Sequence, residues 1–252
     1  MIGIGSPAFC QTPFTHMLEE ISKIFDLWEI LAEGEDRLEL AKEGIRYGMT
    51  SMGMHFQVHA PLSDVNIGSV HEPMRRAAIS EVKDTIAMCE KLEIPLVTLH
   101  PGFVQGIAFL DRSKAITKTK ESLLELSKFS MEHAVELVVE NLPANINGTC
   151  THASELLSVL EGTGLGICFD MGHANTAGQV DEFLKEVGRF RNVHLHNNEG
   201  EWDQHNRIDD GSADLEKVVT ALRGRYKGNI IIESTDLESG AESRAVLEKL
   251  LG

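Results

Sequence analysis

The feature that most constrains the fold is a regular alternation of short apolar runs with amphipathic helical segments. Eight runs are predicted to be strands, at residues 2–5, 25–31, 56–60, 95–99, 137–139, 165–169, 193–196 and 229–232. Segments with helical spacing of apolar residues follow them, at 14–24, 36–47, 73–89, 111–133, 151–160, 181–187, 215–222 and 245–251. Short strands that alternate with helices specify a parallel sheet, because parallel neighbours need a crossover connection.

Eight such units in 252 residues match the usual length of a (β/α)₈ barrel. No linker or low-complexity tract divides the chain, so we expect an α/β protein with one TIM-barrel domain over residues 1–252. A doubly wound open sheet is the rival fold. It would need a glycine-rich phosphate turn after the first strand, and Pro7 interrupts the short Gly3–Ser6 segment where that turn would lie.

Composition narrows the possible partners. The net charge is −16, from 23 basic and 39 acidic residues, so a polyanion such as nucleic acid is repelled on average. Metal ions gathered at one mouth of the barrel would reverse that sign locally. The four cysteines have no paired spacing, which fits free thiols in a reducing cytoplasm. With no apolar run of about 18 residues, no membrane partner is expected.

Polar donors stand where the predicted strands end. In a barrel the carboxyl ends of all strands converge on one face, so these residues meet although they lie far apart in sequence. They are His59, His100, Glu140, Asp170, His173, His194, His196, Asp203, His205 and Glu233. Imidazole mixed with carboxylate, without thiolate, suits zinc, manganese, iron or magnesium-like ions.

Each donor also has an ordinary structural explanation. His59 and His100 could be core histidines that bond to the backbone. Glu140 and Glu233 could be paired with lysine or arginine. Asp203 and His205, which lie in a polar loop, could be solvated. Few basic residues lie near any strand end, however, and an unpaired buried carboxylate is costly. Because the donors recur at the same end of successive strands, we predict a divalent-metal site.

These segments resemble a known family, the xylose-isomerase-like, AP-endonuclease-2-type TIM barrels, which include sugar isomerases and epimerases and also endonuclease IV. The matching pieces are VHAPLSDVNIGS (58–69), TLHPG (98–102), VVENLP (138–143), CFDMGHANTAG (168–178), VHLHNNEGEWDQH (193–205) and IIIEST (230–235). They spread over nearly the whole chain. The resemblance is therefore specific for the fold and less so for the function.

For the isomerases and epimerases, the resemblance implies one divalent ion. Its ligands here would be Glu140, Asp170, His196 and Glu233. The two glutamates would then transfer protons on opposite sides of the substrate while the metal polarises its oxygens. We prefer His196 as the ligand, with His194 beneath it or in contact with substrate. Zinc or manganese is expected, with magnesium or cobalt as alternatives.

For endonuclease IV, the resemblance implies three zinc ions that activate a water against a phosphodiester. The same four ligands would be joined by His59, His100, His173, Asp203 and His205, and all nine positions are filled. The number of metal ions per chain, from one to three, is therefore left open.

Of the two activities, we favour a metal-dependent isomerase or epimerase that moves a proton between adjacent carbons of a sugar, a sugar phosphate or a related polyol. The alternative is an endonuclease-IV-type phosphodiesterase for abasic sites. The acidic loop 197–211 carries Arg207 as its only positive charge, which argues against a phosphate backbone as ligand. Arg207 is also the only nearby match for the family's sugar-binding arginine. A metal-storing barrel without catalysis ranks last, and a homo-oligomer is left open.

Overall fold

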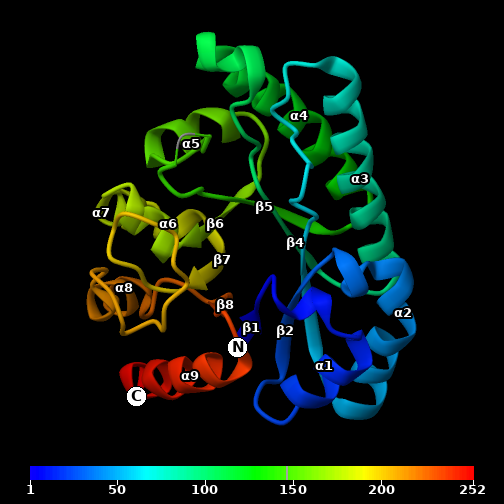
Figure 1. Ribbon diagram of the computed structural model, residues 1–252, viewed down its shortest axis with the longest axis vertical. Helices are drawn as coiled ribbons and strands as arrows, with labels where there is room; N and C mark the ends of the chain where they lie inside the picture. Colours follow the sequence, from blue (N-terminus) through cyan, green and yellow to red (C-terminus); the bar gives the residue numbers. More distant parts are fainter. Residues whose placement is uncertain (146) are drawn as a thin grey trace.

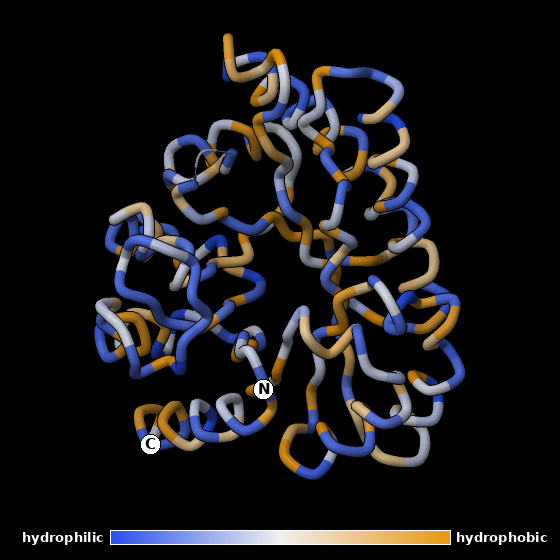
Figure 2. The backbone as a smooth tube through the Cα atoms, in the orientation of Figure 1, coloured by the Kyte–Doolittle hydropathy of each residue, from blue (hydrophilic) through white to orange (hydrophobic). Residues whose placement is uncertain are grey.

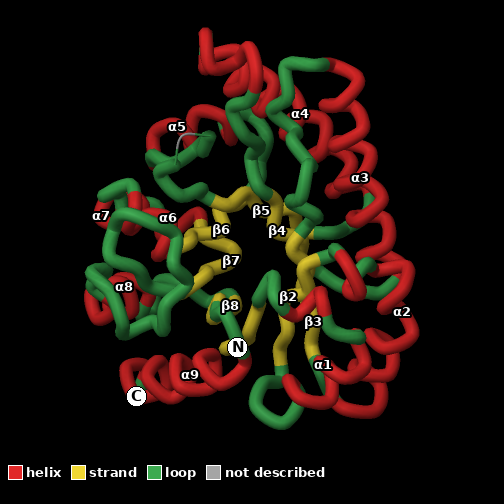
Figure 3. The backbone as a smooth tube through the Cα atoms, in the orientation of Figure 1, coloured by secondary structure: helices red, strands yellow, loops and turns green. Residues whose placement is uncertain are grey.

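A closed barrel of eight parallel strands forms the centre of the molecule, in the order β1 to β8. The computed structural model describes residues 1–145 and 147–252. The strands are β1 (Ile2–Gly5), β2 (Leu27–Leu31), β3 (His55–His59), β4 (Leu96–Leu99), β5 (Glu136–Glu140), β6 (Gly166–Asp170), β7 (Phe190–Leu195) and β8 (Asn229–Glu233). Figure 3 shows them as a ring with the helices outside. The predicted TIM barrel is confirmed.

Helices cover the outside of the ring (Figure 1). They are α1 (Phe14–Ile21), α2 (Leu38–Tyr47), α3 (Glu72–Lys91), α4 (Arg112–Glu132), α5 (Ala153–Leu160), α6 (Met171–Thr176), α7 (Val180–Leu184), α8 (Leu215–Leu222) and α9 (Leu237–Leu251). Hydrophilic and hydrophobic residues alternate along them (Figure 2), as expected of helices with one buried face. None of the helices in the described part of the chain is both long and apolar enough to cross a membrane.

The outer core of the barrel is apolar and aromatic. Trp28 on β2 is fully buried and stacks on Phe14 of α1, with ring centroids 4.7 Å apart. Phe56 on the neighbouring strand β3 lies against the same indole ring at 6.2 Å. Because successive strand residues point to opposite faces, Glu29 and Gln57, next to these aromatics, point into the barrel instead. The interior is therefore polar on this side.

Several predicted boundaries differ from the structure. The last helix begins at Leu237 rather than at 245, because the Asp236 side chain accepts a hydrogen bond from the Ser239 amide at 2.8 Å and caps it. The segment after β6 lies outside the predicted helical segments but forms the short helix α6, which is capped in the same way by Asp170. His173 is thus held on a helix.

Candidate metal centre

A cavity of about 220 Å³ opens at the carboxyl ends of the strands. Its walls are formed by Gly5, Ser6, Pro7, Glu29, Leu31, His59, Leu62, His100, Glu140, His173, Asp203, His205 and Glu233. Seven of the ten donors predicted from the sequence are in this wall. The other three, Asp170, His194 and His196, are fully buried beside it.

The inner donor set consists of Glu140, Asp170, His194 and Glu233, whose ligand atoms all lie within 4.8 Å of one another. His194 Nδ1 is 3.0 Å from Glu233 Oε1 and 3.3 Å from Glu140 Oε1. The nearest oxygen of Asp170 is 3.9 Å away. Four donors from strands β5 to β8 therefore surround one point.

The predicted ligand on β7, His196, falls outside this set, but its Nε2 lies 3.1 Å from Asp170 Oδ1, so His196 stays the predicted ligand. Asp170 pairs with His194 across β6 and β7, so these two side chains lie at the same level of the barrel. His196 is two residues further along and one layer nearer the mouth. His194 does not line the cavity, which also argues against its predicted contact with substrate.

A second donor set shares Glu140 with the first. His59 Nε2 lies 3.0 Å and His100 Nε2 3.3 Å from Glu140 Oε2. The other ring nitrogen of His59 donates to the Ala60 carbonyl at 2.8 Å, which directs Nε2 toward the glutamate. Glu140 thus presents one oxygen to each set.

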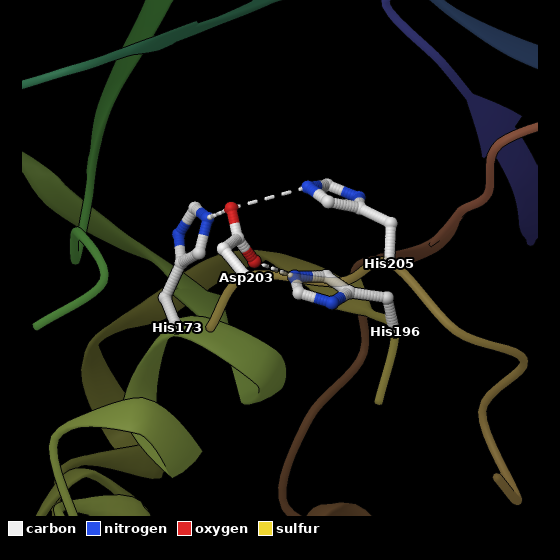
Figure 4. A group of neighbouring side chains, drawn as sticks. All are labelled: His173, His196, Asp203 and His205. Carbon is white, nitrogen blue, oxygen red and sulfur yellow. Dashed lines mark hydrogen bonds and ion pairs between the residues drawn. The ribbon is translucent and has the colours of Figure 1, made fainter. Parts of the chain in front are cut away.

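The third donor set consists of His173, His196, Asp203 and His205 (Figure 4). Asp203 lies between the histidines, with distances of 3.1 Å to His173 Nε2, 3.4 Å to His196 Nε2 and 3.3 Å to His205 Nε2. The His205 ring stacks on His196, with centroids 4.0 Å apart. His205 has a backbone φ of 49°, a left-handed conformation that is uncommon outside glycine and often marks functional sites.

Asparagines hold the backbone around this third set. Asn141 exchanges two hydrogen bonds of 2.9 Å with the main chain of Asp170, which ties the ends of β5 and β6 together. The Asn141 carbonyl accepts from His173 Nδ1 at 2.8 Å, so Nε2 of that ring faces Asp203. Asn197 and Asn206 form an antiparallel bridge that closes the loop carrying the aspartate and His205.

The chemistry of the donors fits divalent cations. Among the described residues neither lysine nor arginine lines the cavity, although several carboxylates converge there. Among the described residues, Asp170 Oδ2, His194 Nδ1 and both ring nitrogens of His196 are buried without a hydrogen-bond partner. Buried polar atoms without partners are costly, and a cation placed among them would satisfy them together. The residues present therefore suit one or more metal ions.

The close contacts between histidines and carboxylates also shift the pKa values of these groups. Burial alone would raise the pKa of Glu140, but the surrounding histidines, with His194 first, hold it well below its usual range. The pKa of Glu233 is likewise lowered, to about 2, because His194 outweighs burial. The pKa of His205 is raised to about 8, since Asp203 and Glu233 outweigh its burial. Both glutamates are therefore ionised at neutral pH, as metal ligands must be.

Arg207, predicted to bind substrate, lies outside the wall of this cavity. Its guanidinium donates to Asp209 Oδ1 and to Glu242 Oε2 at 2.8 Å, on the surface. A residue that the sequence analysis missed is Glu29, which is 3% exposed and does line the cavity. The available signal was a carboxylate inside an otherwise apolar strand.

The fold and site together define a TIM barrel with histidine and carboxylate donors at its strand ends. Residues 18–250 match the family described as xylose isomerase-like TIM barrels, and the chain belongs to that family.

Individual relatives include two classes of protein. The chain is 29% identical to the uncharacterized protein MJ1311 of Methanocaldococcus jannaschii over 99% of its own length and 88% of that protein. A solved structure of a D-tagatose 3-epimerase-like protein superposes with a TM-score of 0.91 and 27% identity, covering 99% of this chain and 96% of that one. A probable endonuclease 4 of Aquifex aeolicus is 24% identical over 67% of this chain and 66% of its own length.

Proposed function

We propose that the protein is a divalent-metal-dependent isomerase or epimerase that moves a proton between adjacent carbons of a small sugar or related polyol. The observation that carries the proposal is the cavity itself. It has about 220 Å³ of space, is bounded by both Glu140 and Glu233, and among the described residues has neither lysine nor arginine in its wall. Such a site suits a small uncharged polyol better than a phosphorylated ligand or a nucleic acid. The similarity to a D-tagatose 3-epimerase-like protein supports this choice.

The two glutamates have the properties of proton-transfer groups. Both are ionised, so either can accept a proton from a carbon next to a carbonyl and, as the acid formed in that step, return it to the neighbouring carbon. Delivery to the opposite face requires that the second glutamate first take up a proton from solvent. The Glu233 side chain is 13% exposed and that of Glu140 is 1% exposed, so Glu233 has the freer approach to a substrate. A divalent ion held by the inner donor set would polarise the substrate's carbonyl and hydroxyl oxygens.

The test is exchange of substrate hydrogen with solvent. Metal-loaded protein in D₂O, given a panel of unphosphorylated ketoses and aldoses, should incorporate deuterium next to the carbonyl of at least one sugar, as read by NMR. Glu233→Gln should slow this exchange by about 10²–10⁴-fold, the usual contribution of a positioned general base. Glu216→Gln, on the exposed surface of α8, is the matched control and should exchange normally. Absence of exchange across the whole panel would contradict the proposal.

A second candidate is an endonuclease-IV-type phosphodiesterase. It is favoured by the ten donors that gather in three sets and by the similarity to a probable endonuclease 4. The net charge of −16 and the acidic loop beside the cavity disfavour a DNA ligand. We expect no cleavage of an abasic-site duplex by zinc-loaded protein at physiological salt. Steady incision, lost in Asp203→Asn, would place this candidate first.

A further inference from the structure

A second cavity, of about 290 Å³, lies at the face of the barrel opposite the metal centre, where the strands β5, β6 and β7 begin. The buried side chains in its wall are mainly apolar and include Val135, Leu137 and Leu165, each at most 8% exposed. The charged residues in the wall are Glu136, Arg189 and Arg191. The cavity therefore combines an apolar base with two guanidinium groups and one carboxylate.

Arg191 is placed at this cavity by an irregularity in the sheet. Ile167 of β6 pairs with Phe190 of β7, and the next pair is Cys168 with Asn192. Arg191 is therefore an extra residue in β7, which makes a β-bulge between the two strands. Bulges of this kind redirect a side chain, and they are common at the rims of barrels.

The side chain of Arg191 is held along the cavity wall. Its stem passes over Gly166, where a Cβ atom would lie 2.4 Å from the arginine Cγ, so only glycine fits beneath it. Nη1 donates to the Phe190 carbonyl at 3.0 Å and to the Gly188 carbonyl at 3.3 Å. Nε lies 3.4 Å from Glu136 Oε1. These contacts leave Nη2 without a partner among the described residues.

The surroundings of the cavity are basic, although the chain as a whole is acidic. The segments 185–191 and 223–228 contain six of the 23 basic residues and only one of the 39 acidic residues. Tyr226 of the second segment donates to the Arg191 carbonyl at 3.3 Å, so both segments lie beside the cavity. Arg189 has no ion pair within the described part of the chain, whereas Arg191 has Glu136. The charges in the wall therefore leave a net charge of one positive unit for a ligand.

We propose that this cavity binds a small monocarboxylate with an apolar body, whose carboxylate pairs with Arg189 and Arg191. Guanidinium groups bind carboxylates through paired, charge-assisted hydrogen bonds. An apolar wall with a few polar groups that fix the orientation is the usual form of a small-molecule site. A dianion such as phosphate fits less well, because Glu136 repels a second charge and the apolar wall stays uncovered. No donor of the metal centre lines this cavity, so the inference is independent of the proposed function.

Titration of the ¹⁵N-labelled full-length chain with phenylacetate, followed by NMR, tests the site. Saturable shifts are expected at the amides of Gly164 and Gly188, which line the cavity. 2-Phenylethanol has the apolar body without the charge, and inorganic phosphate has charge without the apolar body. Each should bind at least about tenfold more weakly than phenylacetate. Shifts only at Gly172, beside the metal centre, would overturn the inference, and so would the absence of saturable shifts.

Three variants separate the cavity from the general surface charge. Arg189→Met and Arg191→Met remove a guanidinium and keep most of the apolar stem, so each should weaken phenylacetate binding at least about tenfold. Lys185→Met is the matched control, because Lys185 belongs to the same basic segment but pairs with Glu182 outside the wall. It should bind within about twofold of wild type.

Arg189→Met decides the matter if Arg191→Met does not fold, because Arg189 has no ion pair within the described residues that its loss would break. Wild-type affinity in Arg189→Met would overturn the inference. An equal loss of affinity in Lys185→Met and Arg189→Met would also overturn it, since the surface charge and not the cavity would then hold the anion.

Discussion

Asp36 is a buried carboxylate outside the donor sets. It shows how burial without a hydrogen-bond partner changes the pKa of a single residue. It is 1% exposed, and neither of its oxygens has a hydrogen-bond partner among the described residues. Burial, together with the nearby charge of Glu35, raises its pKa to about 7. The donors at the strand ends behave differently, because histidines compensate their charges. Unpaired and paired buried carboxylates thus make opposite contributions to stability.

The raised pKa of Asp36 predicts a pH-dependent loss of stability. Its folded-state pKa is above the unfolded value, so its contribution is fully present below about pH 4 and is lost as the pH rises through about 7. Asp36→Asn, which carries no charge, should therefore be more stable than wild type at pH 8. Its free energy of unfolding, measured by urea denaturation, should be higher by about 1–3 kcal/mol. The difference should shrink toward zero at pH 4. A less stable variant at pH 8 would show that the ionised carboxylate has a favourable partner.

At the scale of single elements, the packing of α6 against the end of β7 determines the third donor set. Gly172 on α6 faces the imidazole of His196, and a Cβ atom there would overlap the ring. Asn198 also donates to the Gly172 carbonyl at 2.8 Å and holds the two elements together. Only glycine fits at this contact, because the helix and the histidine approach so closely.

Gly172→Ala should therefore displace His196 from Asp170 and Asp203. We expect a loss of about 1–3 kcal/mol in the free energy of unfolding, typical of overpacking. Any zinc held by the third set should be lost as well, while the inner set keeps its ligands. Gly188→Ala is the matched control, since its Cβ would meet no atom of the described residues within 4 Å and its φ is not positive. Unchanged stability and zinc content in Gly172→Ala would contradict this account.

The sequence predicted the strands and helices better than the contacts between residues on different strands. Eight alternating runs were enough for the barrel, and the donors at the strand ends followed from its topology. A two-residue spacing places His194 and His196 on the same side of β7, so the sequence pattern alone does not separate them. In the structure His194 pairs with Asp170 across the strands, and His196 Nε2 lies 3.1 Å from Asp170 Oδ1. Glu29 was missed for a similar reason, since its partners are on other strands.

At the scale of the whole molecule, charge and metal binding are linked. The chain carries a net charge of −16, and carboxylates converge on one cavity that no lysine or arginine of the described residues lines. A cation bound there would relieve this repulsion in the folded state and would have little affinity for the unfolded chain. Ligands that bind only the folded state stabilise it by mass action.

Removing metal with a chelator should accordingly lower the melting temperature. A site about 99% saturated contributes on the order of 3 kcal/mol, which corresponds to about 5–10 °C for a chain of this size. Calorimetry before and after chelation, with metal restored as a control, measures the shift. Identical melting curves for loaded and stripped protein would show that the donors do not hold the ion.

The most direct test of the account is the metal content of protein purified without chelator or added metal, measured by mass spectrometry for wild type and Glu140→Gln. Because Glu140 belongs to both the inner and the second donor set, the account predicts at least one divalent ion per wild-type chain and a marked loss in the variant. One ion fits the proposed isomerase, and three zinc ions would favour the phosphodiesterase. Wild-type protein that holds no metal, even after reconstitution, would contradict the central claim that these strand ends form a metal centre.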